Sequence, residues 1–219
     1  MSIALKRMKN GSSPGCDGIT TGFMKFFWLK IKCMVLKSLN AAYVNGELSY
    51  TQKRSIMTLI HKGKKSPRDD LNNWRPISLT NTDYKLLAKC IALRLSSVIL
   101  SVINEDQVGF LKGRNICTVI RVIDDLINYM DVKRKPGVLV APDYKAAFDT
   151  ISKDFILYAF KRFNFGAVFV KWIEILMTDA ESCINYMGWI SEPIHLDSGI
   201  RQVPPFADDL YSCSRSIGS

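Results

Sequence analysis

Two acidic positions in this 219-residue sequence could hold metal ions. Asp143 follows the apolar run Val138–Ala141, and the pair Asp208-Asp209 interrupts a short apolar segment near the end of the chain. Carboxylates in apolar segments are costly to desolvate unless they are paired or bind a cation. Two Mg²⁺ ions about 4 Å apart, held by carboxylate oxygens, can catalyse phosphoryl transfer. We therefore predict Asp143 and Asp208 as bridging Mg²⁺ ligands and Asp209 as secondary, with a solvated turn as the alternative for the Asp-Asp pair.

The spacing of apolar residues predicts the elements that position these acids. A run such as 138–141 is typical of a strand that is buried on both faces. A hairpin that turns around Gly188 is expected after the last helix. Apolar stripes at helical spacing, such as the one containing Phe26 and Met34, are expected to be core. The expected helices are Thr20–Val44, Asp83–Val102, Asn115–Met130, Lys145–Phe163 and Ala167–Thr178, and the expected strands are Arg54–Ile60, Arg75–Leu79, Val138–Ala141, Cys183–Tyr186 and Ile190–Leu196.

Composition and charge narrow the class of partner. The chain has 47% hydrophobic and 23% charged residues, which is typical of a globular protein, and the predicted fold class is α/β (α+β). The net charge of +10 favours nucleic acid, with an acidic membrane surface or a merely basic surface as alternatives. Six cysteines without metal-ligand spacing and two histidines argue against a zinc site. Without a signal segment or a membrane-length apolar run, we expect an intracellular protein, nuclear or cytoplasmic, that is not secreted and has no membrane partner.

Six short motifs follow one another along nearly the whole chain. They are Pro14–Gly18, Leu59–Lys62 with Asn73–Leu79, Gln107–Arg114, Asp143–Asp149 (within 138–149), Ser198–Gln202 (198–202) and Phe206–Asp209 (206–209). In this order they resemble the motifs of reverse transcriptases from non-long-terminal-repeat retrotransposons. The resemblance implies RNA-templated DNA synthesis with two Mg²⁺ ions, an RNA template, a DNA primer and deoxynucleotide triphosphates. It also implies a right-hand polymerase fold with a helix-rich fingers region at 1–136 and a partial palm at 137–219.

The resemblance also implies which residues bind the nucleotide. Lys62 and Arg75 match fingers positions that clasp the incoming triphosphate, where a point charge and a bidentate fork are a sensible pair. The alternative is a pair of surface cations on a basic loop. Phe148 matches the aromatic residue under the sugar; the alternative is a buried core phenylalanine, and the two roles are compatible. Gln202 matches a residue near the nucleotide and the template.

The template is expected to lie against the motif Gln107–Arg114. Lys112 and Arg114 are predicted to contact its backbone, and Gly113 is predicted to allow close approach. An RNA template would be held largely through its phosphates and 2′-hydroxyls rather than by its base sequence.

The sequence also departs from the family pattern. Only Val203–Pro205 separates Gln202 from Phe206, where the family carries several dozen residues, and the chain ends ten residues after Asp209. Pro142 lies directly before Asp143, where a central strand needs an N–H donor. We therefore expect an internally deleted and C-terminally truncated domain without a thumb, with little or no activity. The alternatives are a non-catalytic nucleic-acid-binding remnant of a transposable element and an unstable product without function.

Overall fold

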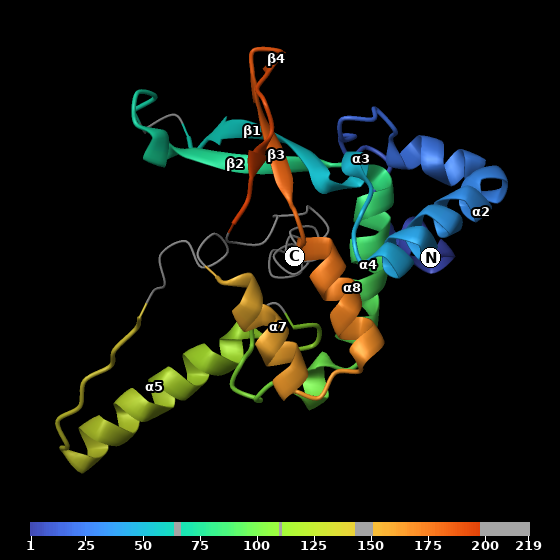
Figure 1. The fold of residues 1–219 in the computed structure, drawn as a ribbon. Coiled ribbons are helices and arrows are strands. Elements are labelled where there is room, and N and C mark those ends of the chain that lie inside the picture. Colours follow the sequence, from blue (N-terminus) through green and yellow to red (C-terminus); the bar gives the residue numbers. More distant parts are fainter. Residues whose placement is uncertain (64–66, 110, 143–150, 198–219) are drawn as a thin grey trace. The chain divides into compact units, whose positions relative to one another are not determined.

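The computed structural model describes residues 1–63, 67–109, 111–142 and 151–197 (Figure 1). The chain divides into two compact units. The first unit combines Met1–Ile91 with Ala147–Ser219, and the second is Ala92–Ala146. Helices together with one small sheet agree with the predicted α/β class.

The first unit begins with helices α1 (Ser2–Arg7) and α2 (Thr21–Asn45). The Thr20 hydroxyl accepts a hydrogen bond from the Phe23 N–H at 3.1 Å and so caps the first turn of α2. Gly46 ends α2 in a left-handed conformation with φ of 80°, and its N–H donates to the Ala42 carbonyl at 3.0 Å. The predicted helix at this position is therefore confirmed, with its ends shifted by a single residue.

A five-stranded sheet joins distant parts of the first unit (Figure 1). Strand β1 (Arg54–His61) follows the short helix α3 (Tyr50–Lys53) and pairs antiparallel with β2 (Trp74–Thr80). On its other edge, β1 pairs in parallel with β3 (Glu181–Tyr186). The first predicted strand pair therefore belongs to the same sheet as the predicted hairpin.

The hairpin after β3 turns at Met187 and Gly188, as its glycine predicts. Both residues have positive φ, 50° and 88°, which is the pattern of a type I′ turn, and Asn185 Oδ1 accepts a hydrogen bond from the Gly188 N–H at 3.1 Å. The returning strand was expected to be continuous, but it is divided. Strands β4 (Trp189–Ile190) and β5 (Ile194–His195) both pair with β3 and are separated by a segment that contains Pro193, which cannot donate a ladder hydrogen bond.

The core of the first unit lies where α2, α4 (Thr82–Ser96) and α8 (Ala167–Met177) meet. The Tyr84 hydroxyl donates to the Leu176 carbonyl at 3.3 Å, and the rings of Tyr43 and Trp172 lie 5.0 Å apart. Helix α7 (Lys153–Arg162) begins at a Ser152 cap and lies against α8. The buried members of this core cluster are Leu39, Ala42, Leu48, Tyr84, Leu87, Ile91 and Ile175.

The second unit contains the 3₁₀ turn η2 (Ile99–Ser101) and helix α5 (Ile116–Lys133). Asn115 Oδ1 accepts a hydrogen bond from the Cys117 N–H at 3.0 Å and caps α5. In the described parts of the chain, no helix is both long enough and apolar enough to cross a membrane.

Three predictions about elements are wrong. Residues 138–141 form no strand, and Val138 is 90% exposed; an apolar run indicates burial, but it specifies no pairing partner. The helix expected over Asp83–Val102 ends at Ser96 and gives way to η2. The helix expected over Lys145–Phe163 is not continuous: residues 151 and 152 are not helical, and the Ser152 hydroxyl accepts the Phe155 N–H at 3.5 Å to cap α7. Residues 145–150 lie outside the described ranges, so the start of the expected helix stays a prediction.

The core assignment for α2 is also wrong in part. Phe26 is 83% exposed and Met34 is 71% exposed, whereas Met24, Leu39 and Ala42 form the buried side of the helix. Apolar residues occur all around α2, so its sequence periodicity could not show which side packs against the core.

Candidate functional site

The cations predicted to clasp a triphosphate lie at the loop end of the β1–β2 hairpin. Ile60 pairs with Arg75, and the ladder continues with the Lys62 N–H, which donates to the Asn73 carbonyl at 2.8 Å. Side chains alternate between the faces of a strand, so this register places Lys62 and Arg75 on the same face as diagonal neighbours. Both residues are exposed. An anion that lies on this face can therefore meet both cations.

Aromatic packing stabilises the opposite face of the hairpin. The rings of His61 and Trp74 are 5.0 Å apart in an edge-to-face arrangement at a directly opposed pair of residues. The Trp74 indole donates to the Arg68 carbonyl at 3.1 Å, and the Asn73 amide donates to the Pro67 carbonyl at 3.0 Å. These bonds tie the loop that includes η1 (Leu71–Asn73) to the hairpin that carries the two cations.

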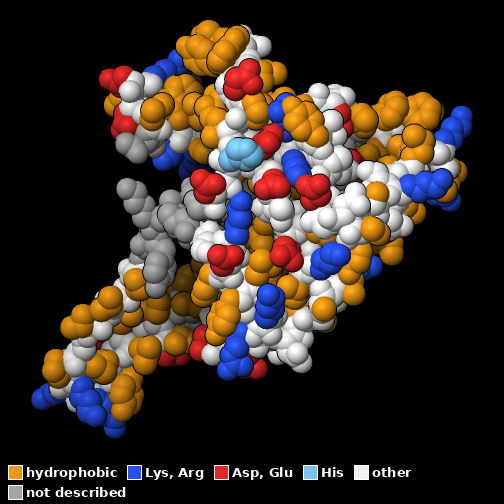
Figure 2. All heavy atoms as spheres, viewed as in Figure 1, with side chains coloured by type: hydrophobic (Ala, Val, Ile, Leu, Met, Phe, Trp, Pro, Cys, Tyr) orange, Lys and Arg blue, Asp and Glu red, His pale blue; other side chains and the backbone are white. Residues whose placement is uncertain are grey.

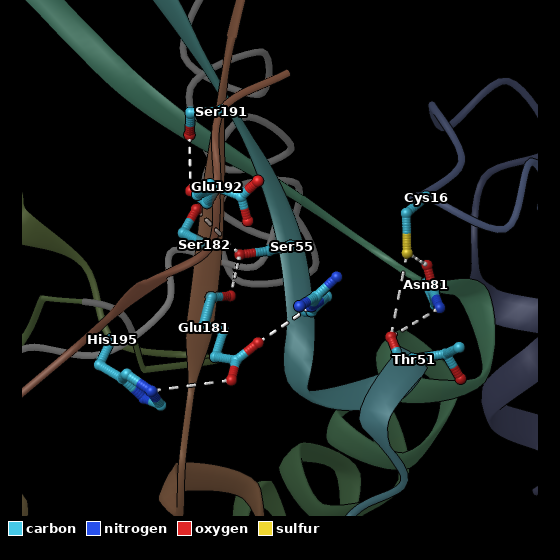
Figure 3. A network of polar contacts seen from close by, with 10 residues as sticks. Cys16, Thr51, Ser55, Asn81, Glu181, Ser182, Ser191, Glu192 and His195 are labelled. Carbon is cyan, nitrogen blue, oxygen red and sulfur yellow. Dashed lines mark hydrogen bonds and ion pairs between the residues drawn. The ribbon is translucent and has the colours of Figure 1, made fainter.

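The loop Pro14–Gly18 packs against the base of this hairpin. A Cβ atom at Gly15 would lie 2.1 Å from Asn81 Oδ1, so only glycine allows this approach. Asn81 in turn donates to the Thr51 carbonyl at 2.9 Å and accepts from the Cys16 thiol at 3.3 Å (Figure 3). Asn81 therefore joins three segments at the junction of β2 and α4.

A buried lysine binds the residue that directly precedes this loop. Lys85 is 3% exposed, and its Nζ donates to the Ser13 carbonyl at 2.6 Å. Burial lowers the pKa of Lys85, and the nearby Asp17 carboxylate opposes this effect. Burial also raises the pKa of Asp17. The sequence of the Pro14–Gly18 motif did not indicate that Lys85 supports it, because Lys85 lies far along the chain on helix α4, which has a largely apolar buried side.

A polar cluster fixes β1 against β3. Arg54 Nε donates to Glu181 Oε2 at 3.0 Å, and the guanidinium lies 3.8 Å from the centre of the Tyr50 ring. The buried Ser55 hydroxyl donates to Ser182 Oγ at 3.2 Å (Figure 3). His195 Nε2 lies 3.8 Å from the other oxygen of Glu181. The cluster positions the two strands, and it presents no nucleophile with an adjacent base.

In the second unit, Arg114 of the predicted template-binding motif binds main-chain carbonyls rather than facing solvent alone. The Arg114 guanidinium donates to three carbonyls of the preceding loop, those of Ile103 (3.3 Å), Asn104 and Gln107 (2.6 Å). Gly113 has φ of 85°, which favours glycine, and Lys112 is exposed. Within this motif, Lys112 therefore presents its charge outward while Arg114 holds the loop.

The remaining predicted site residues lie outside the described residues. Asp143 and Phe148 fall in 143–150, and Gln202, Asp208 and Asp209 fall in 198–219. Within the described ranges, His, Cys, Asp and Glu side chains form no group of three that could hold a metal ion. The metal-binding and nucleotide-binding assignments for these five residues stay predictions.

Comparison with known proteins gives a consistent result. The family described as reverse transcriptase (RNA-dependent DNA polymerase) matches residues 60–202. The transposon TX1 uncharacterized 149 kDa protein of Xenopus laevis is 34% identical over 216 residues, which is 97% of this chain and 16% of that protein. A probable RNA-directed DNA polymerase from transposon X-element of Drosophila melanogaster is 29% identical over 150 residues, 66% of the chain and 16% of the relative. A retrovirus-related Pol polyprotein from the type-1 retrotransposable element R2 of Popillia japonica is 25% identical over 202 residues, 92% of the chain and 27% of the relative.

Proposed function

The chain belongs to the reverse transcriptase (RNA-dependent DNA polymerase) family, and from this premise we propose that it copies an RNA template into DNA by two-metal nucleotidyl transfer. It is a reverse transcriptase domain similar to those of transposon RNA-directed DNA polymerases. The chain spans 16% of the length of the first two relatives described above, so the activity of a whole element protein is part of the proposal.

The register of the β1–β2 hairpin carries the proposal. It places Lys62 and Arg75 on one exposed face, where an ammonium and a guanidinium can both meet the triphosphate of a deoxynucleotide. In the transfer step, the primer 3′-hydroxyl attacks the α-phosphorus of this nucleotide. The bond to the β-phosphate breaks, and diphosphate leaves. The two cations orient the triphosphate and stabilise the charge that develops on the leaving group.

Carboxylates supply the oxygen ligands that Mg²⁺ prefers, so the predicted acids fit this ion by their chemistry. We assign Asp143 and Asp208 as its ligands and Asp209 as a secondary carboxylate. When bound, two Mg²⁺ ions would promote deprotonation of the 3′-hydroxyl and neutralise the leaving diphosphate. Phe148 is assigned to the sugar of the nucleotide, and Gln202 to the nucleotide and the template.

The template strand is assigned to the motif in the second unit. Lys112 contacts a template phosphate, and the backbone at Gly113 allows the strand to approach closely. Arg114 contributes to the same template-binding segment by holding its loop in place. In the terms of a right-hand polymerase, residues 1–136 are the fingers region and residues 137–219 are part of the palm.

Incorporation by the chain alone is expected to be slow. Metal ligands need a rigid supporting shell, and the segment that leads to Asp143 is exposed and forms no strand at residues 138–141. A primed RNA template with deoxynucleotides and Mg²⁺ tests the activity, with Asp143→Asn and Asp208→Asn compared separately. The proposal expects loss of incorporation in Asp143→Asn. Equal incorporation by wild type and Asp143→Asn would remove this residue from the mechanism, and normal incorporation by Asp208→Asn would remove Asp208 as a metal ligand.

The net charge of +10 supports a second candidate function, which is nucleic-acid binding without catalysis. Association would then weaken steeply with salt, because released counterions drive it, and it would not need Mg²⁺. Binding of labelled RNA at several salt concentrations, with Mg²⁺ or a chelator, distinguishes the two. Salt-sensitive binding without Mg²⁺, together with no incorporation by the wild type, would support this second function.

A further inference from the structure

Helix α2 has an outward face that is both apolar and basic. Phe26, Leu29 and Leu36 are 83%, 80% and 41% exposed, and Cys33 between them is exposed as well. Their spacing of three and four residues matches the a and d positions of two heptads. Figure 2 shows hydrophobic and basic side chains together over this helix, at the right of the view. A continuous apolar seam of this kind on a soluble surface marks an interaction site.

The charges beside this seam all have the same sign. In the same heptads, Lys30 and Lys37 occupy e positions and Lys32 occupies a g position, and all three are exposed. Helix α2 contains no aspartate or glutamate from Thr21 to Asn45. In helix pairs, the charges at e and g determine which partner binds. The lysines of α2 therefore favour a partner helix with negative charges at its e and g positions.

These features decide between possible occupants. A second copy of α2 would place lysine opposite lysine, which opposes self-association. Nucleic acid would satisfy the lysines, but the aliphatic side chains of Leu29 and Leu36 give bases neither stacking partners nor hydrogen bonds. A helix with apolar a and d positions and acidic e and g positions satisfies both the seam and the charges. We propose that α2 is a docking helix for a partner protein that presents such an acidic amphipathic helix.

A designed peptide serves as the probe for this surface. It has about three heptads, with leucine at a and d and glutamate at e and g, and a matched peptide carries lysine at e and g instead. Fluorescence anisotropy with the full 219-residue chain measures the binding of each labelled peptide. The glutamate peptide is expected to bind at least about tenfold more tightly than the lysine peptide.

Variants on α2 distinguish specific binding at the seam from nonspecific hydrophobic binding. The double variant Lys30→Glu with Lys37→Glu is expected to reverse the preference, so that the lysine peptide binds more tightly. Leu29→Ser is expected to weaken binding of the glutamate peptide at least about tenfold, because it removes a central apolar anchor. Met34→Ser is the matched control, since Met34 is 71% exposed but lies beside the seam at a b position. The altered side chains are on the surface, so thermal melting should stay close to that of the wild type.

Several outcomes would overturn the proposal. These are failure of the glutamate peptide to bind, equal binding of both peptides, or equal effects of Leu29→Ser and Met34→Ser. RNA binding that is lost in the double lysine variant, without peptide binding, would make α2 a nucleic-acid surface instead. Dimers in sedimentation that disappear in Leu29→Ser would make it a contact between copies. None of these outcomes depends on DNA synthesis, so they leave the proposed polymerase function to its own test.

Discussion

Arg54 Nε lies 3.0 Å from Glu181 Oε2, and this ion pair joins β1 to β3 across 127 residues of sequence. The two side chains are 25% and 16% exposed. The pair begins the parallel register in which Arg54 lies opposite Glu181 and Ser55 opposite Ser182. It is therefore placed to hold together the strands that carry the proposed triphosphate site on one side and the hairpin of β3 and β4 on the other.

Glu181→Gln is expected to lower the urea midpoint of unfolding. The change leaves the guanidinium of Arg54 with a neutral partner while it stays partly shielded from water, and charge-assisted bonds are stronger than neutral ones. The matched control is Glu47→Gln, because Glu47 pairs with Lys53 at 2.5 Å but is 54% exposed. Exposed pairs contribute little, so the control should change the midpoint less. Equal shifts in both variants would show that the β1–β3 pair has no special role.

Gly15→Ala is expected to destabilise the chain by about 1–3 kcal/mol, the range for forcing an extra methyl into a packed site. The new Cβ would meet Asn81 Oδ1 at 2.1 Å and the Thr80 carbonyl carbon at 2.6 Å, both at the junction that supports the hairpin. Gly11→Ala is the control, because nothing lies within 4 Å of a Cβ at that position. Chemical unfolding of both variants checks the prediction, and a Gly15 variant as stable as the Gly11 variant would contradict it.

Stability should rise with pH where Lys85 titrates. Burial lowers the pKa of Lys85 in the folded state below its ordinary value of 10.5. Between the two values the unfolded chain binds more protons than the folded chain, so the burial penalty is fully present below the lowered pKa and disappears towards 10.5. Urea midpoints over this alkaline range should therefore rise less in Lys85→Met than in the wild type. Lys6→Met, on the exposed side of α1, should follow the wild type, and parallel curves for all three proteins would refute the assignment.

Elements with strong end signals could be predicted from sequence. The expected helix Thr20–Val44 agrees with α2 to within one residue at each end, and the structure shows why: Thr20 caps its start and Gly46 ends it. The turn of the hairpin was located because Gly188 adopts the positive φ that a tight turn requires. The diagonal placement of Lys62 and Arg75 was not predicted from their spacing alone, but it agrees with their assignment to one ligand.

Features that depend on distant partners could not be predicted. The parallel pairing of β1 with β3 links segments 54–58 and 181–185, and no local pattern in either one specifies the other. Val138–Ala141 has the composition of a buried strand but is exposed, because composition does not provide a neighbouring strand. Arg114 was predicted as a template contact, and its sequence gave no sign that the guanidinium binds the carbonyls of its own loop.

Arg75→Ala is expected to weaken binding of a Mg²⁺-deoxynucleotide complex by about 10–100-fold, because a bidentate guanidinium contact to phosphate is lost. Arg75→Lys should recover part of this loss, since the charge stays but the fork does not. Arg68→Ala is the control, since Arg68 binds the hairpin through its main-chain carbonyl. Equilibrium dialysis with template and primer present measures binding without requiring turnover. Similar losses of nucleotide binding in the Arg68 and Arg75 variants would indicate that Arg75 acts only through general surface charge.

Lys112 and Arg114 should affect RNA binding in different ways. Lys112→Ala removes one proposed phosphate contact, so the slope of log K against log salt should fall by about 0.7–1. Arg114→Lys keeps the charge but loses the fork that reaches Ile103, Asn104 and Gln107. It should weaken RNA binding with little change in the salt slope, and it should speed hydrogen exchange in the loop at 103–109. Unchanged hydrogen exchange at 103–109 in Arg114→Lys would contradict the proposal that the Arg114 guanidinium holds this loop in place.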